Sequence, residues 1–474
     1  MPRALLLRRA ELLDGRIVDV RIEHGHIAAL APQLHDDAET VIDAAGGLLL
    51  PGLHDHHAHI AATAAARNSV RCGPPDVMNA RELEAALAVP GQGWLRGVGY
   101  HECVTGALID RHWLDRFAPQ RPMRVQHRTG RLWIFNSAGL AALRATGLQP
   151  PAGLDSETGR LFDEDGWARR ALGGRAPGFA AIGAAYARCG VTGVTDMTPG
   201  NGAAAAAHFA REHASGALPQ RVVLAGAPDL AILAPGVSLG PVKFHLHEAH
   251  LPEFEVFVAA IEAAHSQRRA VAVHCVTAAE LVFTLAALRD AGVAPGDRIE
   301  HASVTPDAQL QEIATQGIAV VVQPHFVAER GDAYLADIPA DDWPDLYRLR
   351  SFLAAGVALA GGSDTPFGDL DPWAVMRAAV TRSTAGGQML GLREALTPEA
   401  ALNLFLADPA ALSGTRIVAM GEAADLCLLA KPWRAVRETL SAKHVCATII
   451  GGRLIDDRVD QPPLQGGCGA YAPA

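Results

Sequence analysis

Short apolar segments alternate with longer amphipathic segments through the middle of this chain, and this rhythm restricts the fold more than any other feature. Eight segments have β-strand character: 48–55, 121–127, 190–196, 241–247, 271–275, 297–301, 318–323 and 357–363. Amphipathic stretches such as 254–269 and 277–291 lie between them. Strands that alternate with helices in this way form parallel sheets. The sequence therefore predicts an α/β fold, a (β/α)8 TIM-like barrel, although segment 219–224 is a ninth candidate strand.

Both ends of the chain have a different pattern. Residues 17–50 and 411–458 consist of short alternating runs broken by glycines, which is typical of antiparallel strands. We expect residues 1–50 and 411–474 to form a small β-sandwich domain with a loose tail, and residues 51–410 to form the barrel. Residues 61–118 contain no convincing barrel strand and are expected to be an insertion.

Composition excludes several classes of protein. The formal net charge of −10 over 474 residues argues against a nucleic-acid-binding surface. No run of about 18 apolar residues suggests a membrane span, and the apolar run before Arg8 is too short for a signal peptide. The seven cysteines form no C-x-x-C pair. These features predict a reduced, cytoplasmic protein without structural disulfides.

Residue types that bind metals lie at the carboxyl ends of the predicted strands, where barrel enzymes have their active sites. His57 and His59 end the first strand, and their spacing in an extended chain places both rings on one face. His274, His301 and Asp364 end later strands. Any one of them alone is more often a hydrogen-bonded structural residue, but together they predict a site for one or two divalent ions. Zinc is the first candidate, with manganese, cobalt and iron as alternatives.

Lysine is rare in this chain, and one lysine lies on a predicted barrel strand. The 41 basic residues comprise 38 arginines and three lysines, namely Lys243, Lys431 and Lys443. A buried ammonium group is costly and a poor ligand. A lysine amine can react with CO2 to give a carbamate, an anionic bridging ligand, whereas arginine cannot. The alternative is that Lys243 reaches the surface or pairs with Glu248.

The motifs resemble those of a known superfamily. The run LLLPGLHDHHAH at residues 48–59 resembles the P-G-aliphatic-x-D-x-H-x-H signature of the amidohydrolase superfamily. VAVHC, RIEHA and GGSDTP follow in the spacing of its metal-dependent hydrolases, and GEAADLCLL with IIGGRLI resembles its return to the β-sandwich. The resemblance spans residues 10–458. TGRLWIFNSAGL, VKFHLHE, RIEHASV and VVQPHF are most similar to the branch containing N-substituted formamide deformylase, and VKFHLHEAHLP more weakly resembles hydrolases of phenylureas and thiocarbamates.

This resemblance implies specific roles. His57 and His59 would bind the more buried metal, a carbamylated Lys243 would bridge two metals, and His274 and His301 would bind the second metal. Asp364 would bind the first metal and transfer a proton. If only one metal is bound, Lys243 need not be carbamylated.

The chain departs from that branch near the expected substrate. Gly130-Arg131 stands where the branch usually has Gly-His, and His245-Leu246-His247-Glu248 follows the lysine where the branch often has Asp-Gly. The substrate therefore does not transfer with the resemblance, whereas the metal ligands are untouched.

Several further residues are candidates for contact with substrate. His325 follows the seventh predicted strand and is a candidate oxyanion donor or a structural turn residue. Arg128 and Arg131, together with His127, end the predicted second strand and either bind an anionic group or pair with surface acids. Strand parity places His245 and His247 on the same side as Lys243.

The function that these features predict is metal-dependent hydrolysis of a small amide-like molecule. Metal-activated hydroxide would attack the carbonyl of an amide, urea or carbamate-type C–N bond, with Asp364 as proton shuttle. One alternative is an aminohydrolase that deaminates a heterocycle, and Lys243 counts against it because such enzymes usually lack the modified lysine. The other is a non-catalytic scaffold. Association into a homo-oligomer is left open.

Overall fold

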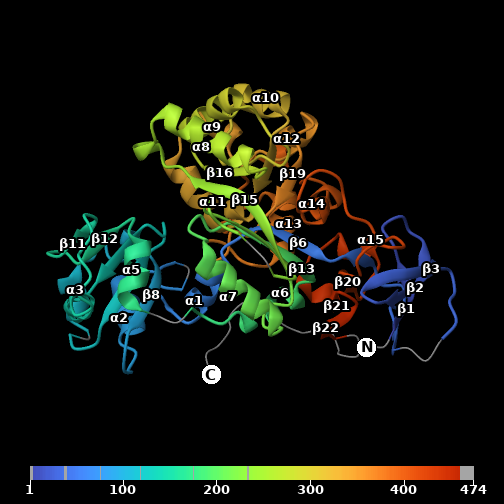
Figure 1. Ribbon diagram of the computed structural model, residues 1–474, viewed down its shortest axis with the longest axis horizontal. Helices are drawn as coiled ribbons and strands as arrows, with labels where there is room; N and C mark the ends of the chain where they lie inside the picture. Colours follow the sequence, from blue (N-terminus) through green and yellow to red (C-terminus); the bar gives the residue numbers. More distant parts are fainter. Residues whose placement is uncertain are drawn as a thin grey trace. The chain divides into compact units, whose positions relative to one another are not determined.

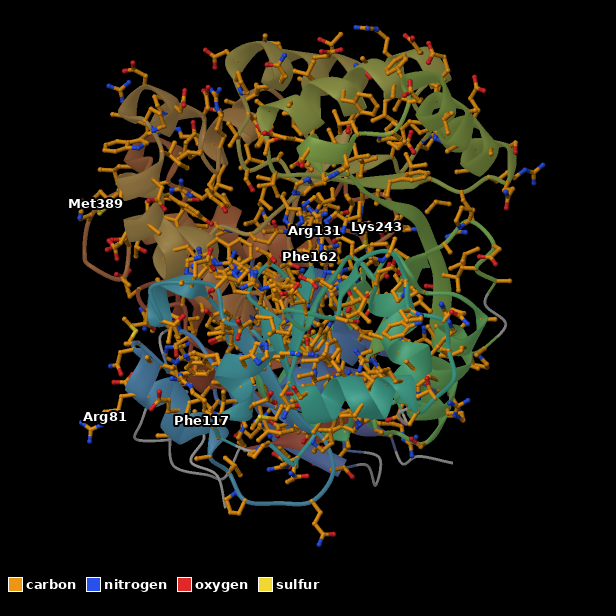
Figure 2. The ribbon with its side chains drawn as sticks, turned by 90° about the vertical axis from the view of Figure 1, so that its left-hand side faces the viewer. Arg81, Phe117, Arg131, Phe162, Lys243 and Met389 are labelled. Atoms are coloured by element: carbon orange, nitrogen blue, oxygen red, sulfur yellow. The ribbon has the colours of Figure 1, made fainter. Side chains whose placement is uncertain are left out.

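The computed structural model describes residues 4–36, 40–74, 76–117, 119–173, 176–231 and 234–458, and the predicted tail after 458 lies outside them. The chain divides into two compact units, Met1–Ile60 with Phe179–Ala474, and Ala61–Gly178 (Figure 1). Of the side chains labelled in Figure 2, Lys243 and Met389 belong to the first unit and the rest to the second, namely Arg81, Phe117, Arg131 and Phe162.

Eight parallel strands form the barrel of the first unit. In spatial order they are β6 (Leu53–Ala58), β13 (Val191–Asp196), β14 (Arg221–Gly226), β15 (Val237–His245), β16 (Val271–Cys275), β17 (Arg298–His301), β18 (Ala319–Val322) and β19 (Leu359–Gly361). The segment after β19 returns to β6, because the Asp364 amide donates to the His57 carbonyl oxygen (2.7 Å) and the His59 amide to that of Thr365 (2.9 Å). The predicted fold class is confirmed.

Helices separate most of these strands, and both faces of several strands are buried. Every residue of β6, β13, β17 and β18 is buried, as expected for parallel strands covered by helices. The α-helices of this unit are α6 (Ala180–Arg188), α7 (Ala203–Ala214), α8 (Phe254–Ser266), α9 (Ala278–Ala291), α10 (Asp307–Gln316), α11 (His325–Asp337), α12 (Arg350–Ala354), α13 (Pro372–Thr381), α14 (Pro398–Leu406) and α15 (Trp433–Val436). Short 3-10 turns are η2 (Glu248–His250), η3 (Ala340–Asp345), η4 (Leu392–Glu394) and η5 (Ala442–His444).

Two four-stranded sheets from the chain ends share one apolar core. The first has the order β3 (His26–Ala31), β2 (Ile17–Glu23), β1 (Leu5–Glu11), β4 (Thr40–Asp43), and the second the order β22 (Arg453–Asp457), β21 (Val445–Ile450), β20 (Leu426–Leu429), β5 (Leu49–Pro51). Leu7 and Val20 of the first sheet belong to the same core cluster as Leu428 and Ile449 of the second. The two sheets therefore form the small sandwich that the sequence predicts.

The second unit has a sheet of its own. Its order is β11 (Leu154–Asp155), β12 (Arg160–Phe162), β10 (Leu132–Phe135), β9 (Met123–His127), β8 (Leu95–Tyr100), β7 (Val70–Arg71). Its helical elements are α1 (Ile60–Arg67, whose first residue falls in the first unit), α2 (Ala80–Leu87), η1 (Glu102–Val104), α3 (Arg111–Asp115), α4 (Ser137–Arg144) and α5 (Asp165–Leu172).

This unit corrects two expectations. Segment 121–127 is not the second barrel strand: it forms β9 in the sheet of the second unit, and the ninth candidate, 219–224, contributes the barrel strand β14. The compact insertion extends to residue 178 and does not end at 118. The physical reason is visible in the burial pattern: only Met123 and Val125 of β9 are buried, so it is covered on one face, unlike the barrel strand β13.

The described ranges contain no helix with the length and apolar character needed to cross a membrane. The six described cysteines are all free thiols.

Candidate metal centre

Three side chains from opposite ends of the barrel sheet converge at its carboxyl edge. The possible ligand atoms of His57, His301 and Asp364 all lie within 4.8 Å of one another. Nε2 of His57 is 3.5 Å from Oδ1 of Asp364, and Nε2 of His59 is 3.2 Å from the same oxygen. The predicted ligands His57, His301 and Asp364, from β6, β17 and the segment after β19, therefore lie close together in space.

The orientation of each ring is set by an oxygen atom on its far side. Nδ1 of His57 lies 2.5 Å from Oε2 of Glu300. Nδ1 of His59 lies 2.9 Å from Oγ1 of Thr198, and Nδ1 of His301 lies 2.7 Å from Oε1 of Gln323. The Glu300 carboxylate and the Gln323 amide oxygen accept a hydrogen bond from Nδ1–H, so Nε2 of His57 and Nε2 of His301 each present a lone pair, whereas the Thr198 hydroxyl can donate or accept. A nitrogen lone pair that faces a carboxylate is repelled by it unless a cation lies between the two. Hydrogen-bond partners on the far side of the ring are typical of metal-binding histidines.

Backbone conformation also turns two of these residues toward the site. His301 and Asp364 have φ values of 75° and 50°, in the left-handed region that residues with a Cβ atom rarely adopt. Such conformations persist where the surrounding structure holds them, and they are concentrated at functional sites.

The protonation states of these groups suit a cation. Burial opposes ionisation of Asp364, but the neighbouring rings, His57 foremost, outweigh it and hold its pKa below the usual range. Burial lowers the pKa of His301 to about 3 and also lowers the pKa of His57. The site therefore offers a carboxylate and, in His57 and His301, two imidazoles whose protonation burial opposes, which is the donor set of zinc and its neighbours.

Lys243 and His274 extend the cluster. Lys243 lies on β15 with 6% of its surface exposed, and its Nζ has no hydrogen-bond partner within the described part of the chain. Burial lowers its pKa from 10.5 to about 8. The ring of His274, on β16, is 4.5 Å from that of His301. An ammonium group that is buried without a hydrogen-bond partner is costly.

Comparison with known proteins decides the family. A model described as the amidohydrolase family matches residues 40–456. The chain belongs to the amidohydrolase family. The N-substituted formamide deformylase of Arthrobacter pascens is 26% identical over 475 residues, covering 84% of this chain and 85% of that protein. The putative amidohydrolase YtcJ of Bacillus subtilis strain 168 is 23% identical, covering 87% and 90%.

Solved structures agree on the fold. An uncharacterized metal-dependent hydrolase from Pyrococcus horikoshii OT3 has a TM-score of 0.72 at 19% identity, covering 90% of this chain and 97% of that one. N-isopropylammelide isopropylaminohydrolase from Burkholderia multivorans has a TM-score of 0.53 at 17% identity, covering 97% and 99%. The resemblance predicted from the motifs is confirmed. This amidohydrolase is a hydrolase of carbon–nitrogen bonds other than peptide bonds.

Several residues of the site were not predicted from the sequence. Besides the ring partners above, Asp55 fixes the segment that carries Asp364. Its carboxylate accepts hydrogen bonds from the Ser363 amide (2.9 Å), the Ser363 hydroxyl (2.6 Å) and the Tyr186 hydroxyl (2.9 Å), and burial raises its pKa to about 6. The available signal was the presence of charged residues, Asp55 and Glu300, inside strands expected to be fully buried.

His325 lies close to this site, but its geometry argues against an oxyanion donor. The side chain is 2% exposed, and Nε2–H donates to the Ser363 carbonyl oxygen at 2.9 Å. Burial lowers the pKa of His325 to about 4, so the ring is neutral and has one N–H. Because that N–H is already engaged, Nδ1 is an acceptor.

The two histidines that follow Lys243 differ in position. The ring of His245 lies 4.3 Å from that of His274, next to the candidate ligands. His247 lies beyond β15, and its Nδ1 accepts a hydrogen bond from the Ala249 amide. A substrate role for either stays a prediction.

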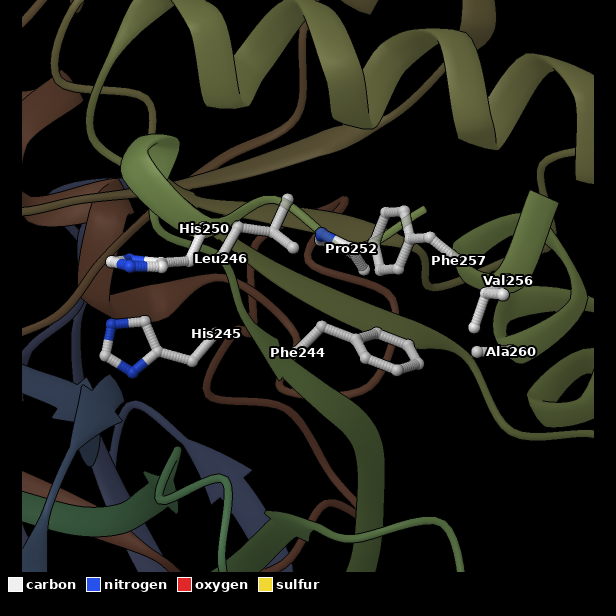
Figure 3. A pocket seen from close by; sticks show the side chains of 8 residues that line it. All are labelled: Phe244, His245, Leu246, His250, Pro252, Val256, Phe257 and Ala260. Carbon is white, nitrogen blue, oxygen red and sulfur yellow. The ribbon is translucent and has the colours of Figure 1, made fainter. Parts of the chain in front are cut away.

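A pocket of about 360 Å³ lies beside the end of β15 (Figure 3). Phe244 on β15 packs at 5.2 Å against Phe257 on α8. Phe244 neighbours Lys243 in the strand and so points to the opposite face. The apolar part of this pocket therefore lies against α8, outside the barrel. It is lined by Phe244, His245, Leu246, His250, Pro252, Val256, Phe257 and Ala260.

The remaining predicted substrate residues belong to the second unit. Arg131 pairs with Asp163 through two hydrogen bonds, one of 2.6 Å from Nε, and Arg128 is exposed. Their substrate role, like that of His127, stays a prediction.

His127 joins a second histidine–carboxylate cluster, with His101 and Glu102. Here Nδ1 of His101 accepts from the Cys103 amide (3.2 Å), and Nδ1 of His127 accepts from the Thr129 amide (3.3 Å). In a neutral ring the proton is then on Nε2, and His127 donates it to Oε2 of Glu102 at 2.9 Å. The contact between His127 and Glu102 is therefore a hydrogen bond within the protein, whereas Nε2 of His101 lies 3.7 Å from the same Glu102 oxygen.

Proposed function

We propose that this amidohydrolase cleaves the C–N bond of a small amide, urea or carbamate-type molecule at the barrel cluster. His57, His59, His274, His301, Asp364 and a carbamylated Lys243 would hold one or two divalent ions, with zinc as the first candidate. The observation that carries this proposal is the convergence of the Nε2 atoms of His57 and His59 on Oδ1 of Asp364, at 3.5 and 3.2 Å. A divalent cation held between these atoms would pair with the carboxylate and with both rings.

The chain supplies the groups for hydrolysis around that cation. A divalent ion in such a site acts as a Lewis acid and makes hydroxide available near neutral pH. Asp364 is ionised, because its neighbours hold its pKa below the usual range. Its carboxylate would accept a proton from the attacking water and return that proton to the leaving nitrogen, which lets an amine depart in neutral form.

Carbamylation of Lys243 would follow from its surroundings. Burial lowers the pKa of the amine to about 8, so a substantial fraction is the neutral nucleophile at pH 7 to 8. That amine attacks the carbon of CO2, and the adduct loses one proton to give an anionic carbamate.

N-substituted formamides are the first substrates to test, because the Arthrobacter relative is named for them and is 26% identical. Arg131 and His245–Glu248 depart from the residues usual in that branch, so phenylureas, carbamates and N-acyl amino acids belong in the same panel. The free, dispersed cysteines fit an enzyme that acts in a reducing cytoplasm.

The deciding experiment is hydrolysis of this panel by purified enzyme loaded with zinc, manganese or cobalt. We expect amine release from at least one amide-like class and its loss in Asp364→Asn. Release of ammonia from aminopurines or aminopyrimidines, with none from the panel, would instead support a heterocycle aminohydrolase. Inactivity on every class by protein that also retains no metal would support the scaffold alternative.

A further inference from the structure

Two oppositely charged side chains lie side by side in the wall of the barrel beneath the candidate ligands. Arg298 and Glu300 belong to β17 and are 2% and 0% exposed. Nε of Arg298 donates to Oε1 of Glu300 at 2.5 Å, and Nδ1 of His57 donates to Oε2 at 2.5 Å. Arg298 also donates to the His56 carbonyl oxygen at 3.0 Å and contacts Sδ of Met197.

Glu300 differs from the other ring partners in its charge. Thr198 and Gln323 offer neutral oxygens to His59 and His301, whereas His57 donates to a carboxylate. A hydrogen bond to a carboxylate is stronger than one to a neutral oxygen, and it raises the basicity of the ring nitrogen that binds a metal.

Arg298 explains how that carboxylate remains charged in the barrel wall. A buried carboxylate is costly unless it is paired and its oxygens are hydrogen-bonded. Arg298 supplies that partner, because its Nε donates to Oε1 of Glu300 while Nδ1 of His57 donates to Oε2. The arginine therefore keeps Glu300 anionic and fixes its direction.

We propose that Arg298 and Glu300 are a positioning pair that fixes the tautomer of His57 and sets the affinity of the barrel cluster for a divalent metal. The inference rests on the proposed function, since it requires that His57 is a ligand. Neither residue touches the reacting atoms, so the pair acts through His57 alone.

An isosteric change separates this role from simple packing. In Glu300→Gln the amide has one acceptor oxygen where the carboxylate has two. If that oxygen stays on Arg298, the amide N–H faces Nδ1 of His57, and the ring must carry its proton on Nε2. The ligand lone pair is then lost without any change in side-chain volume.

The test measures zinc affinity by competition with a chromophoric chelator. We expect Glu300→Gln to bind zinc about 10- to 100-fold more weakly than the wild type, the usual effect of losing an outer ligand partner. The matched control is Glu394→Gln, which changes a buried carboxylate that accepts from the Leu349 and Ser351 amides and not from a histidine. The control is expected to bind zinc as the wild type does.

A second variant guards against misfolding. Replacing a buried ion pair by apolar residues is often neutral for stability, so Arg298→Met/Glu300→Leu is expected to fold and still lose affinity by a similar factor. Wild-type affinity in the folded double variant, within about twofold, would overturn the proposal. A wild-type protein that binds no zinc would instead overturn the proposed function, so the two failures are distinguishable.

Discussion

His57 and His301 of the barrel donate Nδ1–H to oxygen atoms of Glu300 and Gln323, whereas His101 and His127 of the second unit accept backbone N–H groups at Nδ1. Both clusters contain histidines close to a carboxylate. Only the barrel cluster leaves Nε2 lone pairs directed at that carboxylate. The comparison teaches that the partners on the far side of each ring, and not residue type or proximity alone, distinguish a metal centre from a satisfied hydrogen-bond network.

The largest effect is expected at the carboxylate of the barrel cluster. Asp364→Asn removes the proposed proton acceptor and charged ligand with little change in shape. We expect kcat to fall by about 10³-fold or more on the best substrate of the panel. Asp14→Asn, an exposed carboxylate of the sandwich that pairs with Arg16, is the matched control and should keep wild-type kcat. Equal rates in the two variants would remove Asp364 from the mechanism.

Lys243→Arg tests the orphaned amine of the barrel cluster. The variant keeps a positive charge but cannot form a carbamate, so we expect activity and the second metal equivalent, if present, to be lost. Wild-type protein equilibrated with 13C-bicarbonate should show a carbamate carbon resonance that Lys243→Arg lacks. Lys431→Arg, in the loop after β20, is the control. Full activity in Lys243→Arg would refute the carbamate.

The pH dependence of stability tests the burial of the same amine. In metal-free, bicarbonate-free protein the folded pKa is about 8 and the ordinary value is 10.5, so between these values the unfolded chain binds more protons. Stability therefore rises with pH in this window, by about 2 kcal/mol between pH 7.5 and 9.5. Urea unfolding should show this rise in the wild type relative to Lys243→Met. Parallel pH profiles would contradict a buried amine.

The smallest effect is expected in the cluster of the second unit. His101→Asn/His127→Asn removes both rings that face Glu102. Because His127 already donates to Glu102 and both Nδ1 atoms accept backbone N–H groups, we expect the metal content per chain to equal that of the wild type. Loss of one equivalent would show that this cluster also binds a metal and would break the distinction drawn above.

Strand ends were predictable from the sequence because strong local patterns mark them. The runs around His57, His274 and His301 combine buried strands with a terminal histidine, and the structure places those residues at one edge of a barrel. The assignment of 121–127 to the barrel was wrong, because strand character is local whereas sheet membership depends on distant partners. In β9 only Met123 and Val125 are buried, and the residue between them, Arg124, is not. This alternation is typical of a strand that is covered on one face.

The ring partners were not predictable in the same way. Glu300, Thr198 and Gln323 act through contacts between different strands, and no spacing in the sequence reports which nitrogen of a ring faces them. Their identification requires three-dimensional positions. The partners of His101 and His127 required the structure for the same reason.

The central claim is that the barrel cluster is a metal centre, and the metal content per chain tests it most directly. Protein expressed with ample zinc, manganese and cobalt would be dialysed and analysed for metals, beside His57→Asn/Asp364→Asn and His101→Asn/His127→Asn. We predict one or two divalent ions per chain in the wild type and in the second-unit variant, and none in the barrel variant. Metal-free wild-type protein, or a barrel variant with the wild-type metal content, would contradict the account.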